Sequence, residues 1–512
     1  MTVALANFFD KAALGAAQAL QNFDRAAFVA ALDAAPIGVA FDDGAAGSPE
    51  GRLTLDLTVN LLARLYPRLV LAPQGISSNQ LAAELAILAR AINPDIDIGD
   101  DIATTSIMVV VGDTPVSRDV PAVYAGSDGW VVRLSPSHPV GSGATTNPFG
   151  AAAVACFAAA NVFRLRFAEH LPGGSPDRPF TLSLLDLVPN APHPANPEVG
   201  PVDLGESHLV GVGAIGNATV WTLARTPGLC GTLHLVDHEV IDVSNLQRYV
   251  LATQADVGRA KVAVASAALA SAQLDAQPHQ ERWGDFLRSR QNWNLERVVV
   301  AVDSERDRQA VQAALPRWIA NAWTQPGDLG VSRHPFLGDQ ACLTCLYFPD
   351  GAGKNEDQLV AEAIGLPSDL MEIRGLLATG VAVGRDLLER IATALGVPIE
   401  PLLAFEGAPL RAFYTGAICG GLVLGLGGKT DPGAPQAAVP LAFQSALTGI
   451  MLAAELVADA GALRESPPPT TTKIDLLRPL GEHLAVAAAK PASGMCICQD
   501  PDYVTRYKAK YG

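Results

Sequence analysis

The chain has 512 residues, and its 36 Lys and Arg against 52 Asp and Glu give a net charge of −16, which argues against a nucleic-acid-binding surface. A length of 512 residues predicts two to four domains, and 49% hydrophobic against 17% charged residues is typical of large buried cores. Because the sequence lacks a membrane-length apolar run and a basic signal-peptide start, we expect a cytoplasmic protein with no membrane partner.

Residues 1–188 alternate between helical and strand patterns, which predicts an α/β domain. The helical patterns cover 5–35, the segment from Arg52, 79–92 and an Ala-rich stretch from Asn147 to about Glu169. The strand candidates are Leu69–Leu71, Ser106–Val111 and Trp130–Leu134. The segment after Leu69–Leu71, taken as the first strand, has too few glycines for a phosphate-binding loop.

A proline-rich linker is expected at 189–205, and a glycine loop follows it. The loop runs Gly211, Val212, Gly213, Ala214, Ile215 and Gly216, between an apolar strand and an apolar helix. Gly211 permits the tight turn, Gly213 lets the backbone approach phosphates, and Gly216 lets the helix pack on the strand. The free N–H groups and the dipole of the helix N-terminus favour an anion there. The pattern alone would also fit an NAD or FAD enzyme.

Polar residues after the loop favour ATP over a dinucleotide. Asp237 ends the next strand, where an acidic side chain can bind ribose hydroxyls. Asn245, Arg248 and Lys261 then provide polar and cationic groups for a triphosphate. Asp303 follows a further strand, 298–302, and a carboxylate at that edge is a suitable Mg²⁺ ligand.

This series of residues resembles the E1-like (ThiF/MoeB/HesA-type) ubiquitin-activating superfamily. In that family the glycine loop, Asp, Asn, Arg, Lys and a Mg²⁺-binding Asp recur in this order. The resemblance implies a Rossmann-like adenylation domain with a parallel sheet, whose first part is 206–354. Tyr249 departs from the family, in which Gln often follows the Arg, and Ser304 stands where Asn often follows the Asp.

Two interpretations of residues 1–188 remain open. They form either a degenerate, inactive copy of the adenylation fold, packed as a pseudo-dimer partner, or an unrelated α/β domain that recruits a substrate. We favour the first, because E1-like domains occur as pairs, within one chain or as a homodimer.

Four cysteines form two close pairs, Cys342 with Cys345 and Cys496 with Cys498. Two pairs of thiolates can make one tetrahedral Zn²⁺ site in a reducing compartment. The family resemblance implies that this site is structural and ties the C-terminal tail to the adenylation domain. Unligated thiols, or His334 or His483 in place of one sulfur, remain alternatives.

A helical insertion is expected at 355–412, followed at 413–512 by a crossover loop, a closing helix and the zinc-binding tail. Cys419 lies in a Gly-rich segment before the closing helix, where relatives that form a thioester place the nucleophile. The alternative is that Cys419 is a buried packing residue. Cys156 and Cys230 lie in apolar contexts and are interpreted as core residues.

The resemblance implies that the enzyme adenylates the C-terminal glycine of a ubiquitin-like modifier with ATP and Mg²⁺. Cys419 would take the acyl group as a thioester and pass it to an E2-like protein. The overall layout resembles E1 components of bacterial antiviral conjugation systems. The alternatives are a ThiF/MoeB-type enzyme acting on a sulfur carrier or a ribosomal peptide, and a non-catalytic binding subunit.

Overall fold

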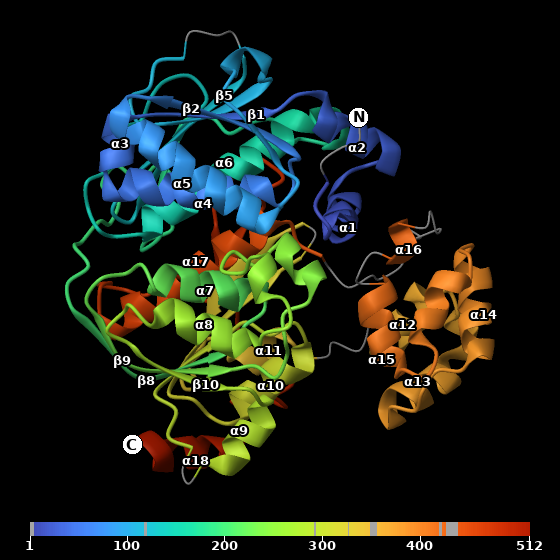
Figure 1. Ribbon diagram of the computed structural model, residues 1–512. Helices are drawn as coiled ribbons and strands as arrows, with labels where there is room; N and C mark the ends of the chain where they lie inside the picture. Colours follow the sequence, from blue (N-terminus) through green and yellow to red (C-terminus); the bar gives the residue numbers. More distant parts are fainter. Residues whose placement is uncertain are drawn as a thin grey trace.

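The computed structural model describes residues 5–116, 120–290, 293–325, 327–348, 356–418, 422–425 and 439–512. Two α/β units are stacked on each other, and a group of helices lies beside them (Figure 1). Each unit contains one mainly parallel sheet covered by helices, which confirms the predicted α/β fold class.

The first sheet has seven strands in the order β3-β2-β1-β4-β5-β6-β7. The strands are β1 (Ile37–Asp42), β2 (Arg68–Gln74), β3 (Asp97–Gly99), β4 (Ile107–Val111), β5 (Ala122–Asp128), β6 (Val131–Ser135) and β7 (Phe180–Ser183). The helices are α1 (Phe9–Ala19), α2 (Arg25–Ala34), α3 (Asp43–Gly47), α4 (Pro49–Ala63), α5 (Ile76–Ile92) and α6 (Phe149–Arg166). From β3 to β5 in this order, neighbouring strands pair in parallel. Strand β6 pairs antiparallel with β5, and β7 pairs antiparallel with β6.

The second sheet has the order β10-β9-β8-β11-β12-β13-β14-β15. Its strands are β8 (Val202–Val210), β9 (Leu229–Val236), β10 (Asp275–His279), β11 (Arg297–Val300), β12 (Trp318–Thr324), β13 (Leu329–Arg333), β14 (Thr471–Ile474) and β15 (Ala485–Val486). Its helices are α7 (Ala214–Leu223), α8 (Lys261–Leu269), α9 (Trp283–Ser289), α10 (Glu305–Ala313), α11 (Leu343–Leu346), α17 (Ala442–Ala460) and α18 (Pro501–Tyr511).

The first seven strands of the second sheet repeat the first sheet strand for strand, in both order and direction. The long helices α6 and α17 occupy the same place in the two units and contact each other between the sheets. This common topology agrees with a second copy of the fold in the first half.

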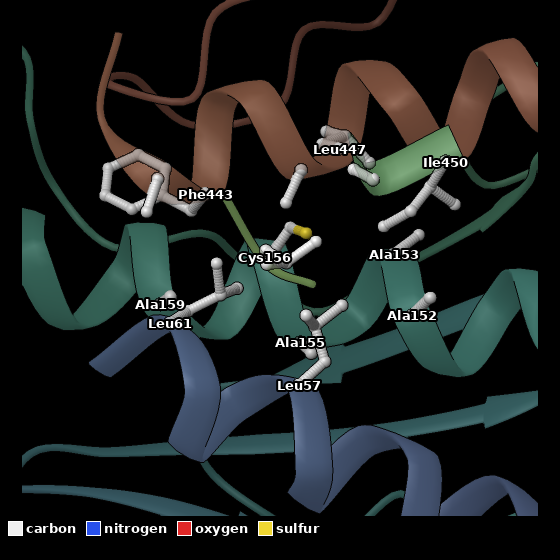
Figure 2. Packing of buried hydrophobic residues seen from close by; sticks show 14 of the residues in the cluster. Leu57, Leu61, Ala152, Ala153, Ala155, Cys156, Ala159, Phe443, Leu447 and Ile450 are labelled. Atoms are coloured by element: carbon white, nitrogen blue, oxygen red, sulfur yellow. The ribbon is translucent and has the colours of Figure 1, made fainter. Parts of the chain in front are cut away.

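The core is continuous across the two units, because α4, α6 and α17 pack together. Figure 2 shows Cys156 of α6 between Leu57 and Leu61 of α4 and Leu447 of α17. Cys156 is fully buried, as predicted for a core residue, and burial raises the pKa of its thiol. Among the described helices, α6 alone has the length and apolar composition to cross a bilayer, and 16 of its 18 residues are buried inside the protein.

The structure corrects the expected position of the first strand and the expected extent of the linker. The first strand is β1 at Ile37–Asp42 rather than Leu69–Leu71, so the loop that corresponds to the glycine loop starts at Asp42. Strand β8 begins at Val202, inside the range expected to be a linker. Sequence periodicity did not reveal β1, because Gly38 and Ala40 interrupt its β-branched pattern.

The expected helical insertion forms a small core of its own. Its helices are α12 (Glu356–Ala363), α13 (Leu370–Thr379), α14 (Arg385–Leu395), α15 (Leu410–Phe413) and α16 (Leu422–Gly425). Phe413, Ile418 and Val423 are buried in this core, so the insertion extends beyond 412 into the segment expected to be the crossover loop. Cys419 lies outside the described residues.

Candidate nucleotide-binding site and cysteine cluster

The glycine loop joins β8 to α7 and leaves open space above one of its residues. Gly211 has φ +91°, and a Cβ atom there would lie 2.7 Å from the Ala301 carbonyl oxygen. A Cβ on Gly216 would lie 2.1 Å from the Gly211 oxygen, so the turn and the helix can approach this closely only with glycine. A Cβ on Gly213 would have the Tyr249 hydroxyl as its nearest atom, at 3.7 Å, so the loop is uncrowded at this residue.

The N-terminus of α7 faces this space without a side-chain cap. Gly213 is the N-cap residue, and no side chain bonds to the first turn, which includes Ala214 and Ile215. The first N–H groups of a helix have no partner within the helix, so they are available to an anion. Asp237, at the end of β9, holds the loop from the other side, since its carboxylate accepts from Val212 N at 2.7 Å.

A short 3₁₀ helix, Val243–Gln247, carries the next expected residues. Asn245 caps it, because its Oδ1 accepts from Asp242 N at 3.0 Å. Arg248 donates from Nη1 to Gln247 Oε1 at 3.2 Å. The ring of Tyr249 lies 6.0 Å from the Arg248 guanidinium carbon, and its hydroxyl faces Gly213. Sequence reasoning noted Tyr249 only as a departure from the family, although it lines the site.

Lys261 opens α8 and is buried, with 5% of its side chain exposed. Its Nζ forms an ion pair with Glu239, whose side chain is 54% exposed, and lies 5.3 Å from the centre of the Tyr249 ring. Burial lowers the pKa of Lys261, but Tyr249, Asp237 and Glu239 outweigh this effect and raise the pKa above its ordinary value. Lys261 is therefore a fixed cation, and a bound phosphate would replace Glu239 as its partner.

Asp303 is exposed just beyond β11, at the same sheet edge as the glycine loop. Arg308 fixes the turn before it, because its Nε and Nη2 donate to the Val302 carbonyl oxygen at 3.1 and 2.6 Å. Arg308 also donates to the Tyr347 hydroxyl at 2.5 Å. An exposed carboxylate beside a phosphate-sized space suits a hard cation such as Mg²⁺.

Gly211, Asp237 and Asp303 follow β8, β9 and β11, which are neighbours in the sheet. Since the carboxyl ends of parallel strands meet at one edge, these three residues lie at the same edge of the sheet. Lys261 lies beside Tyr249, whose hydroxyl faces Gly213. The binding roles of these residues and of Asn245 and Arg248 stay predictions, and Cys419 lies outside the described residues.

The four predicted cysteines also lie together. Cys342 Sγ is 3.6 Å from the Sγ atoms of both Cys345 and Cys496. Cys345 Sγ is 3.3 Å from Cys496 Sγ and 3.5 Å from Cys498 Sγ. Tetrahedral zinc with Zn–S bonds of about 2.3 Å places its sulfurs about 3.8 Å apart, so the cluster could hold zinc. His334 is bonded to Ala341 O and Ser332 Oγ and contributes no ligand to this group.

A second cluster, Glu206, His208 and His234, lies on the opposite side of the sheet from α7. Its carboxylate accepts from Arg290 and lies 3.2 Å from His234 Nε2, and His234 Nδ1 lies 2.9 Å from His279 Nε2. Glu206, His234 and His279 thus form a polar network, whereas both ring nitrogens of the buried His208 have no hydrogen-bond partner among the described residues.

The corresponding edge of the first sheet is closed by two carboxylates. Asp42 accepts from Ala45 N at 2.7 Å and from Asp113 N at 3.0 Å. Asp43 accepts from the first turn of α5, at Ile76 N (3.1 Å) and Ser78 N (2.8 Å). In the first half, the chain's own carboxylates therefore bond to amides just after β1 and β4 and at the start of α5.

A parallel sheet with a glycine turn, a cation and two carboxylates at its carboxyl edge defines an α/β nucleotide-binding protein. The profile described as the ThiF family matches residues 204–496, more than half of the chain. The chain belongs to the ThiF family, which groups it with ATP-dependent adenylyltransferases. The profile described as prokaryotic E2 family C matches residues 40–168.

Two curated proteins are similar to this chain. The protein y4jF of Sinorhizobium fredii is 50% identical over 510 residues, covering 100% of this chain and 98% of that protein. The sulfur carrier protein ThiS adenylyltransferase of Escherichia coli is 26% identical over 228 residues, covering 42% of this chain and 85% of that enzyme. Among solved structures, MccB of E. coli bound to MccA matches 58% of this chain and 67% of its own, at 14% identity and a TM-score of 0.35.

Proposed function

We propose that this protein is an E1-like activating enzyme that adenylates the C-terminal glycine of a ubiquitin-like modifier. The observation that carries the proposal is the fixed, buried cation Lys261 beside the uncapped glycine loop, with Asp303 exposed at the same edge. A dinucleotide site has no need of this cation, whereas a triphosphate does.

In this reaction a carboxylate oxygen of the modifier attacks the α-phosphorus of ATP, and pyrophosphate leaves. Lys261, Arg248 and the α7 amides bind the phosphates and stabilise the charge that develops on the leaving group. Asp303 would hold Mg²⁺, which neutralises phosphate oxygens when it is bound. Positioning and charge stabilisation carry this step, so no acid–base residue is required.

The second step of the proposal is transfer to a thiol. The Cys419 thiolate attacks the acyl carbon of the adenylate, a thioester forms and AMP leaves. The support for Cys419 is its place in the sequence before α17. Residues 40–168, which match the E2 profile, contain one cysteine, the fully buried Cys156, so a separate E2-like protein is proposed as the acceptor.

We place this activity in the cytoplasm, with the two halves of one chain acting as a pseudo-dimer; a homodimer remains the alternative. A role in bacterial antiphage defence is part of the same proposal, supported by the layout of two related folds with one open site. Zinc in the cysteine cluster is proposed to be structural.

ATP–pyrophosphate exchange with candidate modifiers tests the first step. Asp303→Ala should abolish exchange while the protein stays folded, because the residue is exposed. Tight NAD binding without ATP binding would contradict the proposal. Cys419→Ala should keep exchange and lose the reductant-sensitive modifier adduct seen on a non-reducing gel.

The 26% identity to the ThiS adenylyltransferase favours a second candidate, activation of a sulfur carrier or a short ribosomal peptide. The same exchange assay separates the two. Exchange that depends on a peptide or a sulfur carrier, with no thiol adduct in the wild-type protein, would support the second candidate.

A further inference from the structure

We propose that the first half positions the segment 246–252 beside the nucleotide-binding site of the second half, and that Arg64, the C-cap residue of α4, is the positioning residue. The inference rests on the proposed ATP-dependent adenylation. It gives the first half, whose own site is closed by carboxylates, a specific task in the reaction.

Arg64 is 2% exposed, and its guanidinium reaches across the boundary between the two halves. Its Nη1 donates to the Leu246 carbonyl oxygen, and its Nη2 donates to the Ala252 carbonyl oxygen at 3.1 Å. Its Nε donates to Asn60 Oδ1 at 3.0 Å, and Asn60 Nδ2 donates to the Val250 carbonyl oxygen at 3.0 Å. Three carbonyls of one short segment therefore take their partners from helix α4.

This segment is irregular backbone, in which carbonyls lack the partners that a helix or strand supplies. It carries Asn245 and Arg248, which are proposed to bind the phosphates, and Tyr249, whose hydroxyl faces Gly213. The described partners of Arg64 are carbonyl and amide oxygens rather than a carboxylate, and burial lowers its pKa to about 9. A buried guanidinium used only to bind carbonyls fixes the course of the segment that it holds.

Helix α1 provides a second, independent contact from the first half. Gln18 Oε1 accepts from Val439 N at 2.8 Å, just before α17. A Cβ on Gly15 would lie 2.9 Å from the Val439 carbonyl oxygen, so α1 approaches this backbone closely. Gln247 Nε2 donates to the Pro440 carbonyl oxygen at 3.2 Å and links the two held segments. The first half thus holds the segment 246–252 directly and, beside it, the residues just before α17.

The test compares Arg64→Met, Arg64→Lys and Asn60→Ala in the full chain. The matched control is Arg52→Met, an arginine on the same helix that is exposed and pairs with Glu84 within the first half. The probes are the affinity for a non-hydrolysable ATP analogue, measured by calorimetry, and amide hydrogen exchange over residues 243–253.

We expect Arg64→Met to weaken ATP binding by about tenfold or more and to speed amide exchange in 243–253. Arg64→Lys should restore part of the affinity, because one ammonium reaches some of the carbonyls that the guanidinium fork spans. Arg52→Met should bind ATP like the wild-type protein. A folded Arg64→Met that binds ATP with wild-type affinity overturns the inference.

If Arg64→Met does not fold, Asn60→Ala decides, because it frees the Val250 carbonyl and the Arg64 Nε but keeps the Arg64 bonds to the Leu246 and Ala252 carbonyls. Weaker ATP binding with an unchanged melting temperature supports the inference, and unchanged binding overturns it. A wild-type protein that binds ATP without modifier-dependent exchange would overturn the proposed function alone. Wild-type affinity in Arg64→Met would overturn the positioning role alone.

Discussion

Replacing Cys496 by Ser should detach the C-terminal segment from the second unit, because the cysteine cluster joins two distant parts of the chain. Cys345 and Cys496 are separated by 151 positions, yet their sulfurs lie 3.3 Å apart. Helix α18 follows immediately, and besides hydrogen bonds to backbone carbonyls it packs Val504 and Tyr507 against the Phe336 cluster. Lys510 Nζ donates to Leu315 O at 2.9 Å, and Tyr511 Oη donates to Leu295 O at 3.1 Å.

The expected loss of unfolding free energy follows from the length of chain that the cysteine cluster closes into a loop. A cross-link across about 150 residues removes about 5 kcal/mol of chain entropy from the unfolded state, in the treatment used for disulfides. Metal binding contributes to folding in the same way when the ligands come together only in the folded chain. The α18 contacts keep part of this anchoring, so we expect a loss on the order of 2 to 5 kcal/mol.

Zinc content and urea unfolding measure the effect. Wild-type protein purified without a chelator should contain one zinc per chain, and Cys496→Ser should contain none and unfold at lower urea. Amide exchange should rise first in α18. The control is Cys230→Ser, which alters a half-buried thiol on β9 outside the cluster. Wild-type protein without zinc, or Cys496→Ser with unchanged zinc and stability, would refute the reasoning.

Two further predictions concern buried charges. Lys261→Met should weaken ATP binding while the protein stays folded, because its partner Glu239 is largely exposed and can be hydrated after the cation is lost. Calorimetry measures the affinity for ATP. An unchanged affinity would mean that Lys261 does not contribute to the site. Glu455 is fully buried on α17, and burial alone would raise its pKa, but Arg333 and Arg464 lower it to about 2. The carboxylate therefore adds on the order of 3 kcal/mol above pH 4.5, and this is lost as the pH falls towards 2. Urea unfolding at several pH values should show this loss in the wild-type protein and not in Glu455→Gln, and equal pH profiles would exclude the effect.

The local part of the site could be predicted from the sequence. Gly211 and Gly216 are required by one turn, and Asp237 and Asp303 follow strands whose ends must meet in a parallel sheet. Two closely spaced cysteine pairs in one chain have few roles other than binding a metal ion. In each case the physical constraint acts within a few residues or through a simple rule of topology.

Other residues depend on tertiary contacts and carry no local signal. Nothing in the sequence around Asn60 and Arg64 distinguishes them from other polar residues of a helical pattern. Only the packing of the first half against the second shows that they bind the Val250 and Ala252 carbonyls. Tyr249 lines the phosphate space because the 3₁₀ helix before it turns the ring towards Gly213. Strand β1 escaped prediction because small residues reduce its β-propensity, and the loop at Asp42 was missed with it.

That loop leads to a last prediction about nucleotide stoichiometry. Two folds with one strand order predict two sites if phosphate binding depends on topology alone, and one site if it depends on free amides. In the first half, Asp42 and Asp43 accept from loop and helix amides. Donation from the Ser78 amide lowers the pKa of Asp43 below its ordinary value. A triphosphate would have to displace both carboxylates against their repulsion. We therefore expect one ATP bound per chain in a calorimetric titration, and none in a chain whose Lys261 site has been disabled by Asp303→Ala together with Lys261→Met. Two equivalents in the wild-type protein, with one left in the double variant, would mean that the carboxylates yield to a nucleotide and that the first half also binds it.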